Sequence, residues 1–206
     1  MNNIKTVIIF AHPNLESGSI ANKIIINQIK DKTDIKIRNL YQLYPDFKID
    51  VVAEQKALTE ADIIVFQYPF HWYSLPGLLK EWLDKVFLYG FAYGSGGNKL
   101  NGKEFLISTT IGGPADSYSA HGHNSHTIDE YLKPLQQTAK LAGMNFNAPI
   151  VSHNMVYVPG GDNDKEGVEK RALDHGARLL EFINKKASIN NHTNSTKLSS
   201  SVKETC

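Results

Sequence analysis

Short apolar runs alternate with longer amphipathic segments along most of this chain. The runs at 4–10, 35–40, 62–67, 104–110 and 145–152 are rich in β-branched and aromatic residues, as buried parallel strands are. Between and after them, apolar residues recur at helical spacing over about 19–30, 50–60, 75–88, 127–142 and 166–184. The alternation predicts an α/β fold with a doubly wound, five-stranded parallel sheet in the strand order 2-1-3-4-5.

Capping residues mark the ends of several predicted helices. Ser19 precedes the first helix, Pro76 suits the first turn of the third, and Thr127 with Glu130 forms a capping box for the fourth. Pro134 should kink that fourth helix or delay its start.

The last segment differs in composition from the rest. From residue 185 the chain consists mainly of Ser, Thr, Asn and Lys, which offer too little apolar surface to build a core. We therefore predict one folded domain, residues 1–184, followed by a polar, disordered tail, residues 185–206.

Composition limits the class of partner. The 206 residues hold 22 Lys and Arg against 21 Asp and Glu, and the resulting net charge of +1 suggests no basic face for nucleic acid or anionic lipid. Cys206 is the single cysteine, which is typical of a reducing compartment. The apolar run from Val7 to Phe10 is too short for a signal peptide or a membrane span. We expect a cytoplasmic protein that binds a small molecule.

Three predicted loops follow the first, third and fourth strands, whose carboxyl ends form the edge where open α/β sheets bind ligands. The first loop leads from His12 to a helix amino terminus at Ser19, which suits a phosphate. The second, from Tyr68 to Pro76, carries four aromatic rings and a His and suits a flat ligand such as a flavin or quinone ring. In the alternative interpretation, aromatic side chains of this loop only cap the core.

The third loop, 109–114, is rich in Thr and Gly, which lets a ligand ring approach the backbone. Beyond it, His121, His123 and His126 invite a zinc interpretation, but no Cys and no His-Glu-x-x-His helix accompanies them, so we predict no metal site. Tyr118 and His123 can instead supply a proton or hydrogen bond to a substrate oxygen. A polar surface loop without chemistry is the alternative.

Six segments together carry a family resemblance: Ala11-His12-Pro13, Ser19-Ile20-Ala21-Asn22, Leu40-Tyr41-Gln42-Leu43-Tyr44-Pro45-Asp46-Phe47, Pro69-Phe70-His71-Trp72-Tyr73, Gly90-Phe91-Ala92-Tyr93-Gly94 and Thr109-Thr110-Ile111-Gly112-Gly113. Over about residues 4–183 the chain resembles the NAD(P)H:quinone oxidoreductases, flavodoxin-like flavoproteins similar to mammalian DT-diaphorase. Within that family it most resembles the KefF-type ancillary flavoproteins of glutathione-gated potassium efflux. The resemblance implies a flavodoxin-like domain.

The resemblance also implies roles for residues. Those that would hold the flavin phosphate and ribityl chain are His12, Ser19, Ile20, Ala21 and Asn22. Those that would line the two sides of the flavin ring are Phe70, His71, Trp72 and Tyr73, and Thr109, Thr110, Ile111 and Gly112. Tyr118 and His123 would assist hydride transfer, and Tyr93 would reach the partner subunit's quinone pocket in a homodimer.

The implied function is a flavin-dependent, two-electron, ping-pong transfer of hydride from NADH or NADPH to a quinone. FMN is the implied cofactor, with FAD as the alternative. A second function is a regulatory subunit that binds and activates a glutathione-gated potassium efflux transporter, which would bring the protein to the inner face of the cell membrane. A third is a binding domain with an empty crevice.

Overall fold

The computed structural model describes residues 4–161 and 163–201, with side chains up to residue 189. Its centre is a parallel sheet in the order β2-β1-β3-β4-β5, which confirms the predicted order, and a further strand, β6, also pairs with β4. The strands are β1 Thr6–Phe10, β2 Ile35–Asn39, β3 Ile63–Pro69, β4 Glu104–Thr110, β5 Asn145–Phe146 and β6 Ile150–Ser152. Every residue of β1 and β3 is buried, because helices cover both faces of the sheet.

The predicted strand 145–152 is two strands in the structure. β5 pairs with residues 104–105 and β6 with residues 108–110 of the same neighbour, β4. Between them, Asn147 places its side-chain amide on Glu104 and on the Phe105 carbonyl, and Pro149 has no N–H to donate to a ladder. The sheet thus has six strands instead of five.

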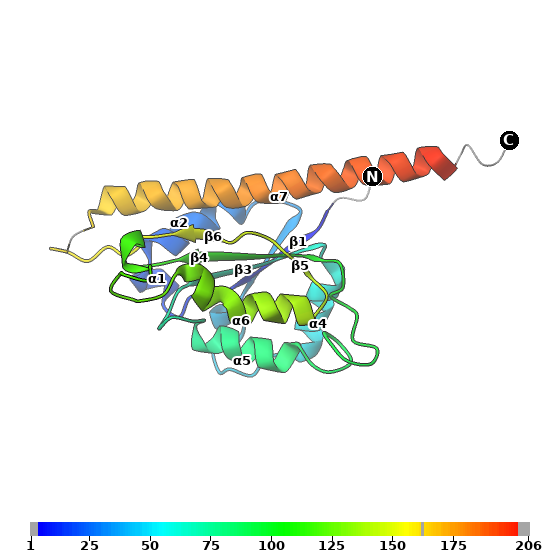
Figure 1. The fold of residues 1–206 in the computed structure, drawn as a ribbon, viewed down its shortest axis with the longest axis horizontal. Helices are drawn as coiled ribbons and strands as arrows, with labels where there is room; N and C mark the ends of the chain where they lie inside the picture. The colour runs from blue at the N-terminus through cyan, green and yellow to red at the C-terminus, as the bar shows by residue number, and fades with distance from the viewer. Residues whose placement is uncertain (1–3, 162, 202–206) are drawn as a thin grey trace.

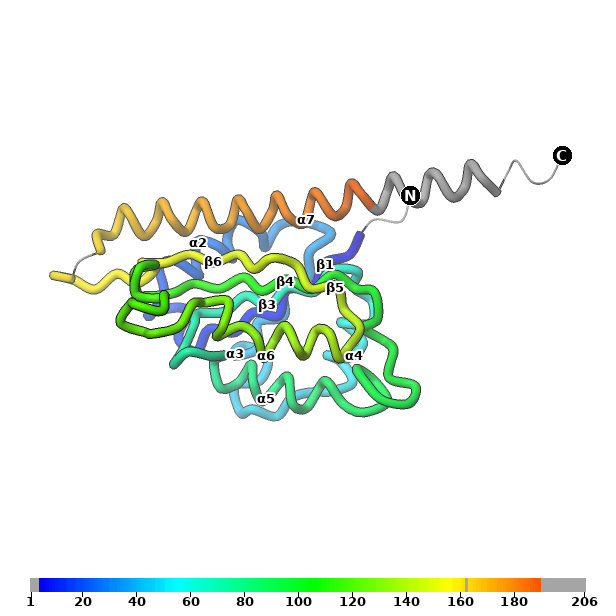
Figure 2. The backbone as a smooth tube through the Cα atoms, in the orientation of Figure 1, coloured from blue at the N-terminus to red at the C-terminus, as the bar shows by residue number. Residues whose placement is uncertain are grey.

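Helices form a layer on each face of the sheet. α2 (Ile20–Ile29) and α7 (Lys165–Ser201) lie side by side on one face, as Figure 1 and Figure 2 show. α3 (Leu40–Leu43), α4 (Val51–Glu60), α5 (Gly77–Val86) and α6 (Ile128–Leu141) lie on the other. Each layer packs its own apolar core against the sheet. The short helix α1 (Leu15–Gly18) and a 3₁₀ turn, Ala115–Ser117, belong to loops that follow β1 and β4.

The capping predictions for two helices are confirmed. Ser19 Oγ accepts the Asn22 amide N–H at the start of α2, and Thr127 with Glu130 forms the capping box of α6. Pro76 lies one residue before α5 instead of inside its first turn, and α6 passes through Pro134 without delay at its start.

α7 extends beyond the end predicted for the last helix. Residues 185–201 are helical where the sequence predicted a disordered tail, and residues 202–206 lie outside the part of the chain that the structure describes. No Gly or Pro follows Gly176, so a helix held by packing can propagate through the polar residues beyond it. Lys186 within this segment contacts Glu104 of the sheet at 2.5 Å. The division into a domain and a tail stays a prediction.

Candidate active site

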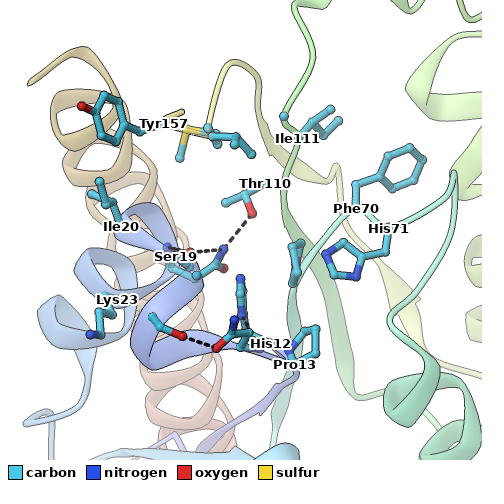
Figure 3. Close-up of a pocket in the computed structure, with 18 of the residues that line it drawn as sticks. His12, Pro13, Ser19, Ile20, Lys23, Phe70, His71, Thr110, Ile111 and Tyr157 are labelled. Atoms are coloured by element: carbon cyan, nitrogen blue, oxygen red, sulfur yellow. Dashed lines mark hydrogen bonds between the residues drawn. The ribbon is translucent and has the colours of Figure 1, made fainter. Parts of the chain in front are cut away.

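A cleft of about 600 Å³ opens at the carboxyl ends of β1, β3 and β4. Phe10, Gln67 and Ser108 lie in register across these strands, so the segments that follow them emerge together. Figure 3 shows the N-terminal end of α2 with Ser19, Ile20 and Lys23 on one side of the cleft, and Phe70 and His71 on the other. The volume lies within the range of about 300–1,000 Å³ that is usual for small-molecule sites.

The wall formed by α2 suits an anion. The first N–H groups of a helix lack partners within the helix, and the helix dipole places a partial positive charge there. Ser19 Oγ lies at this end, and the Lys23 ammonium approaches from one turn further on, where it forms an ion pair with Glu16 at 2.9 Å. Glu16, Ser17 and Lys23 line the cleft but were not among the residues predicted from the sequence.

Two uncharged imidazoles face the cleft. Burial, with a smaller effect of His71, lowers the pKa of His12 to about 4, and burial also lowers the pKa of His71. His12 Nδ1 accepts the Asn14 amide N–H at 3.1 Å, so Nε2 carries the proton. The rings lie 6.4 Å apart. At neutral pH the cleft therefore offers hydrogen-bonding groups here without a positive charge.

A tight hairpin forms the aromatic loop after β3. His71 and Ser74 exchange two backbone hydrogen bonds of 3.1 and 2.9 Å, and Trp72 and Tyr73 between them both have positive φ angles, 46° and 62°. Tyr73 stacks on Tyr131 of α6 at 5.2 Å. Trp72 is 93% exposed and does not line the cleft of this chain, so it caps no core.

Alternation along β4 separates two neighbouring predicted residues. Thr110 lines the cleft together with Ile111 and Gly112, whereas Thr109 is fully buried and donates its hydroxyl to the Tyr68 carbonyl at 2.9 Å. Ala21 is also buried and does not line the cleft.

A further loop, after β6, closes the cleft on the side of Ile111 and Tyr157 (Figure 3). The Met155 amide donates to the Ile111 carbonyl at 2.9 Å. Val156 packs closely on Gly112, because a Cβ added to Gly112 would lie only 3.1 Å from the Val156 side chain. The lining residues of this loop were not predicted from the sequence; they are Met155, Val156, Tyr157 and Pro159. The signal was available, because they follow the carboxyl end of a strand as the other loops do.

Tyr118 lies in an aromatic cluster beside the cleft. Its ring is 6.2 Å from Phe70, and burial raises its pKa. The imidazole placed against it is that of His153, at 5.4 Å, a residue that was not predicted from the sequence. His123 is exposed. Neither Tyr118 nor His123 lines the cleft within this chain.

Tyr93 lies at another surface. It is 39% exposed and lines a hollow of about 310 Å³ with Phe87 of the α5 end and Leu141 of α6. Of the residues predicted to bind the cofactor, the structure brings together around the main cleft His12, Ser19, Ile20, Asn22, Phe70, His71, Thr110, Ile111 and Gly112.

The described residues hold neither a metal-binding cluster nor a helix that could span a membrane. No cluster of three or more His, Cys, Asp or Glu side chains that would hold a metal ion occurs within 4–161 and 163–201. Over the same residues, no helix has both the length and the apolar character needed to cross a bilayer.

Comparison with known proteins gives consistent matches over most of the chain. Residues 4–179 match the Flavodoxin_2 family, described as a flavodoxin-like fold. The chain is 41% identical over 180 residues to an uncharacterized NAD(P)H oxidoreductase, YrkL, of Bacillus subtilis (strain 168), which covers 87% of this chain and 98% of that protein.

Solved structures agree with this match. General stress protein 14 of Treponema denticola in complex with FMN has a TM-score of 0.79 and 34% identity, over 87% of this chain and 98% of that chain. An NADPH-quinone reductase of P. pentosaceus has a TM-score of 0.72 and 26% identity, over 84% of this chain and 96% of that chain.

Proposed function

This chain belongs to the Flavodoxin_2 family of flavodoxin-like proteins, and we propose that it works as an FMN-dependent NAD(P)H:quinone oxidoreductase. The observation that carries the proposal is one cleft that has a helix amino terminus on one wall and, on the other, the Phe70 ring and the neutral imidazole of His71. The relatives add the cofactor and both substrates, since their names include NAD(P)H, FMN and quinone reductase.

The donor set of the cleft fits FMN. The α2 amino terminus, Ser19 and Lys23 offer N–H, hydroxyl and ammonium donors, which suit a phosphate. Phe70 and the backbone near Gly112 provide surfaces for a ring system. FMN, when bound, supplies the capacity to accept a hydride from NAD(P)H and to pass it to a quinone.

The residues of the chain would bind and orient the two substrates. We propose that nicotinamide and quinone occupy the same place in turn, so that initial-rate plots should show the parallel lines of ping-pong kinetics. Ala21 and Thr109 would act by packing, because their side chains are buried away from the cleft.

The first experiment is the absorption spectrum of the purified protein. Two visible bands of oxidised flavin are expected, with FMN as the flavin released on denaturation. A colourless protein that takes up neither FMN nor FAD would contradict the proposal. Release of FAD in place of FMN would correct the cofactor but leave the reaction class intact.

Tyr118 and His123 are the proposed helpers of hydride transfer. Tyr118 adjoins Phe70, and its raised pKa keeps it a hydrogen-bond donor at neutral pH. Tyr118→Phe should slow a half-reaction by ~10²-fold while FMN stays bound, as is usual for general acid–base help. His123→Ala tests whether His123 assists hydride transfer, as the family resemblance implies. His153→Ala tests whether the imidazole next to Tyr118 does so instead. Stopped-flow measurement of flavin reduction and reoxidation would separate the three variants.

A homodimer would explain the exposed aromatic surface around Tyr93. Leu88, Tyr89, Tyr93 and Leu141 are between 39% and 65% exposed, and exposed apolar residues gathered in one region often mark an interface. Sedimentation should give about twice 23.0 kDa. If Tyr93 enters the partner's site, heterodimers of a Tyr93 variant and a Tyr118 variant should regain partial activity. A fully active monomer would contradict this part of the proposal.

The potassium efflux function stays a prediction based on sequence motifs. Binding to such a transporter would place the protein at the inner face of the membrane. Co-purification with the transporter, compared with a detergent control, would test it without bearing on the redox activity.

A further inference from the structure

A continuous chain of hydrogen bonds, buried except at its partly exposed Arg178 end, leads from α7 to the cleft. Its six links measure 2.6–3.1 Å, and three of its members, His175, Gln67 and Ser108, are fully inaccessible to solvent. In order from α7, the members of this relay are Arg178, Ser152, His175, Ser108, Gln67, Asn22 and Thr110. The function of a hydride-transfer site does not by itself require such a chain.

The cation at the α7 end gives the relay its direction. The Arg178 guanidinium can only donate, and it donates to Ser152 Oγ at 2.6 Å. The two ring nitrogens of His175 each lie 2.8 Å from a hydroxyl, Nδ1 from Ser152 Oγ and Nε2 from Ser108 Oγ. With Arg178 as donor, Ser152 is free to donate to Nδ1, which leaves Nε2–H to donate to Ser108. In the opposite direction, Arg178 and His175 would both donate to Ser152, and the Ser152 proton would lack an acceptor among the described residues. Burial lowers the pKa of His175 to about 3, which keeps its ring neutral with one acceptor nitrogen.

The same direction continues to the cleft. Ser108 donates to Gln67 Oε1 at 2.6 Å, and Gln67 Nε2 donates to Asn22 Oδ1 at 3.1 Å. The Asn22 amide group then donates to both hydroxyls at the cleft, to Thr110 Oγ1 at 3.0 Å and to Ser19 Oγ at 3.2 Å (Figure 3). Among the described residues neither hydroxyl donates to a protein group, so both protons are left for a ligand. If the relay ran in the opposite direction, the Ser19 and Thr110 hydroxyls would both donate to Asn22 Oδ1, and neither proton would be available to a ligand.

We propose that Arg178, acting through His175, sets the hydrogen-bond polarity of the cleft, so that Ser19 and Thr110 present donors to the bound cofactor. Arg178 and His175 are then positioning residues, because neither lines the cleft. The identity of the ligand rests on the proposed function, since the phosphate and carbonyl oxygens of FMN are acceptors that match these donors. The direction of the relay does not depend on that identity.

The direction can be measured in the protein without FMN. Long-range ¹⁵N–¹H correlation spectra of the imidazoles distinguish the two neutral tautomers of His175. The proton is expected on Nε2, and Arg178→Met should shift the population toward Nδ1–H. A proton on Nδ1 in the wild-type protein would overturn the proposal, whether or not FMN binds.

The effect on the cleft can be measured as FMN affinity, by quenching of flavin fluorescence. Arg178→Met and His175→Asn should each raise the Kd about 3- to 10-fold, in the range of couplings within one polar network. His175→Gln should restore most of the affinity lost in His175→Asn, because its amide nitrogen can replace the Nε2 donor to Ser108. Lys170→Met, which removes an exposed cation from the same helix, controls for charge and should leave the Kd unchanged.

The outcomes separate this inference from the proposed function. Wild-type protein that fails to bind FMN contradicts the proposed function, and the tautomer measurement still decides the relay. FMN binding with equal Kd in wild type, Arg178→Met and His175→Asn overturns the relay alone. Equal losses in Arg178→Met and Lys170→Met also overturn it, because bulk charge would explain the effect. If His175→Asn does not fold, Arg178→Met and the tautomer decide.

Discussion

The hairpin at Trp72 and Tyr73 has a strained backbone, so a residue better suited to its conformation should stabilise the protein. Both residues have positive φ angles within a two-residue turn, a conformation that favours Asn and Gly. A left-handed conformation costs about 1–2 kcal/mol for an ordinary residue, whereas Asn adopts it much more readily. Because Trp72 is 93% exposed, its replacement removes almost no burial. Trp72→Asn should therefore stabilise the FMN-free protein by about 1 kcal/mol, which raises Tm by about 2–4 °C.

The family resemblance implies that Trp72 lines the flavin ring, although it does not line the cleft formed by this chain alone, so the same substitution should weaken FMN binding. An aromatic contact contributes about 0.5–1.5 kcal/mol beyond burial, so the Kd should rise up to about tenfold. Trp72→Phe is the matched control, because it keeps both the strained backbone and an aromatic ring. The assays are urea unfolding of the FMN-free protein and fluorescence titration with FMN. A Trp72→Asn variant that is less stable than wild type, or more stable with unchanged affinity, would refute this link between strain and function.

Two further predictions concern stability. Glu54 is fully buried and accepts hydrogen bonds from Arg38 and two other side chains, so Glu54→Gln should lower the free energy of unfolding by about 3 kcal/mol or more. Glu60→Gln, at an exposed carboxylate of the same helix, should change it by less than about 0.5 kcal/mol, and equal effects in urea unfolding would contradict the reasoning. In acid, His175 has its pKa lowered from 6.5 to about 3, so the unfolded chain binds a proton that the folded chain does not. Stability should fall as pH drops through this range, by about 1.4 kcal/mol per pH unit for this group, and urea titrations at several pH values should show that His175→Gln removes that part of the slope.

The fold was predictable because its central strands are buried on both faces. β1 and β3 are fully buried, which requires the continuous apolar runs seen in the sequence. The departures have local causes. α1 and α3 have four residues each, too few to show a helical period, and Pro149 divides the predicted last strand. The helix beyond residue 185 continues α7, because no Gly or Pro interrupts it. The prediction of a disordered tail rested only on its lack of apolar surface.

The candidate site was predictable at the level of segments and less so at the level of side chains. Thr109 and Thr110 stand side by side in the sequence, but the two-residue period of a strand sends one to the core and the other to the cleft. The loop after β6 was missed although it follows the end of the predicted strand 145–152, because a site was expected only at the first, third and fourth strands. The partner of Tyr118 was missed because His153 comes from this distant loop, and only the fold brings the two rings together.

Polar residues inside apolar strands are a further signal in the sequence, because they need partners from other elements. Gln67 and Ser108 face each other in register on β3 and β4, each fully buried. A buried polar group without a partner destabilises a protein by about 1–3 kcal/mol, so such residues persist where other elements complete their hydrogen bonds. Here Asn22 of α2 and His175 of α7 do so. Through these hydrogen bonds α2 and α7, on the same face of the sheet, both connect to the hydroxyls of Ser19 and Thr110. The proposed orientation of these two donors therefore depends on how α7 packs.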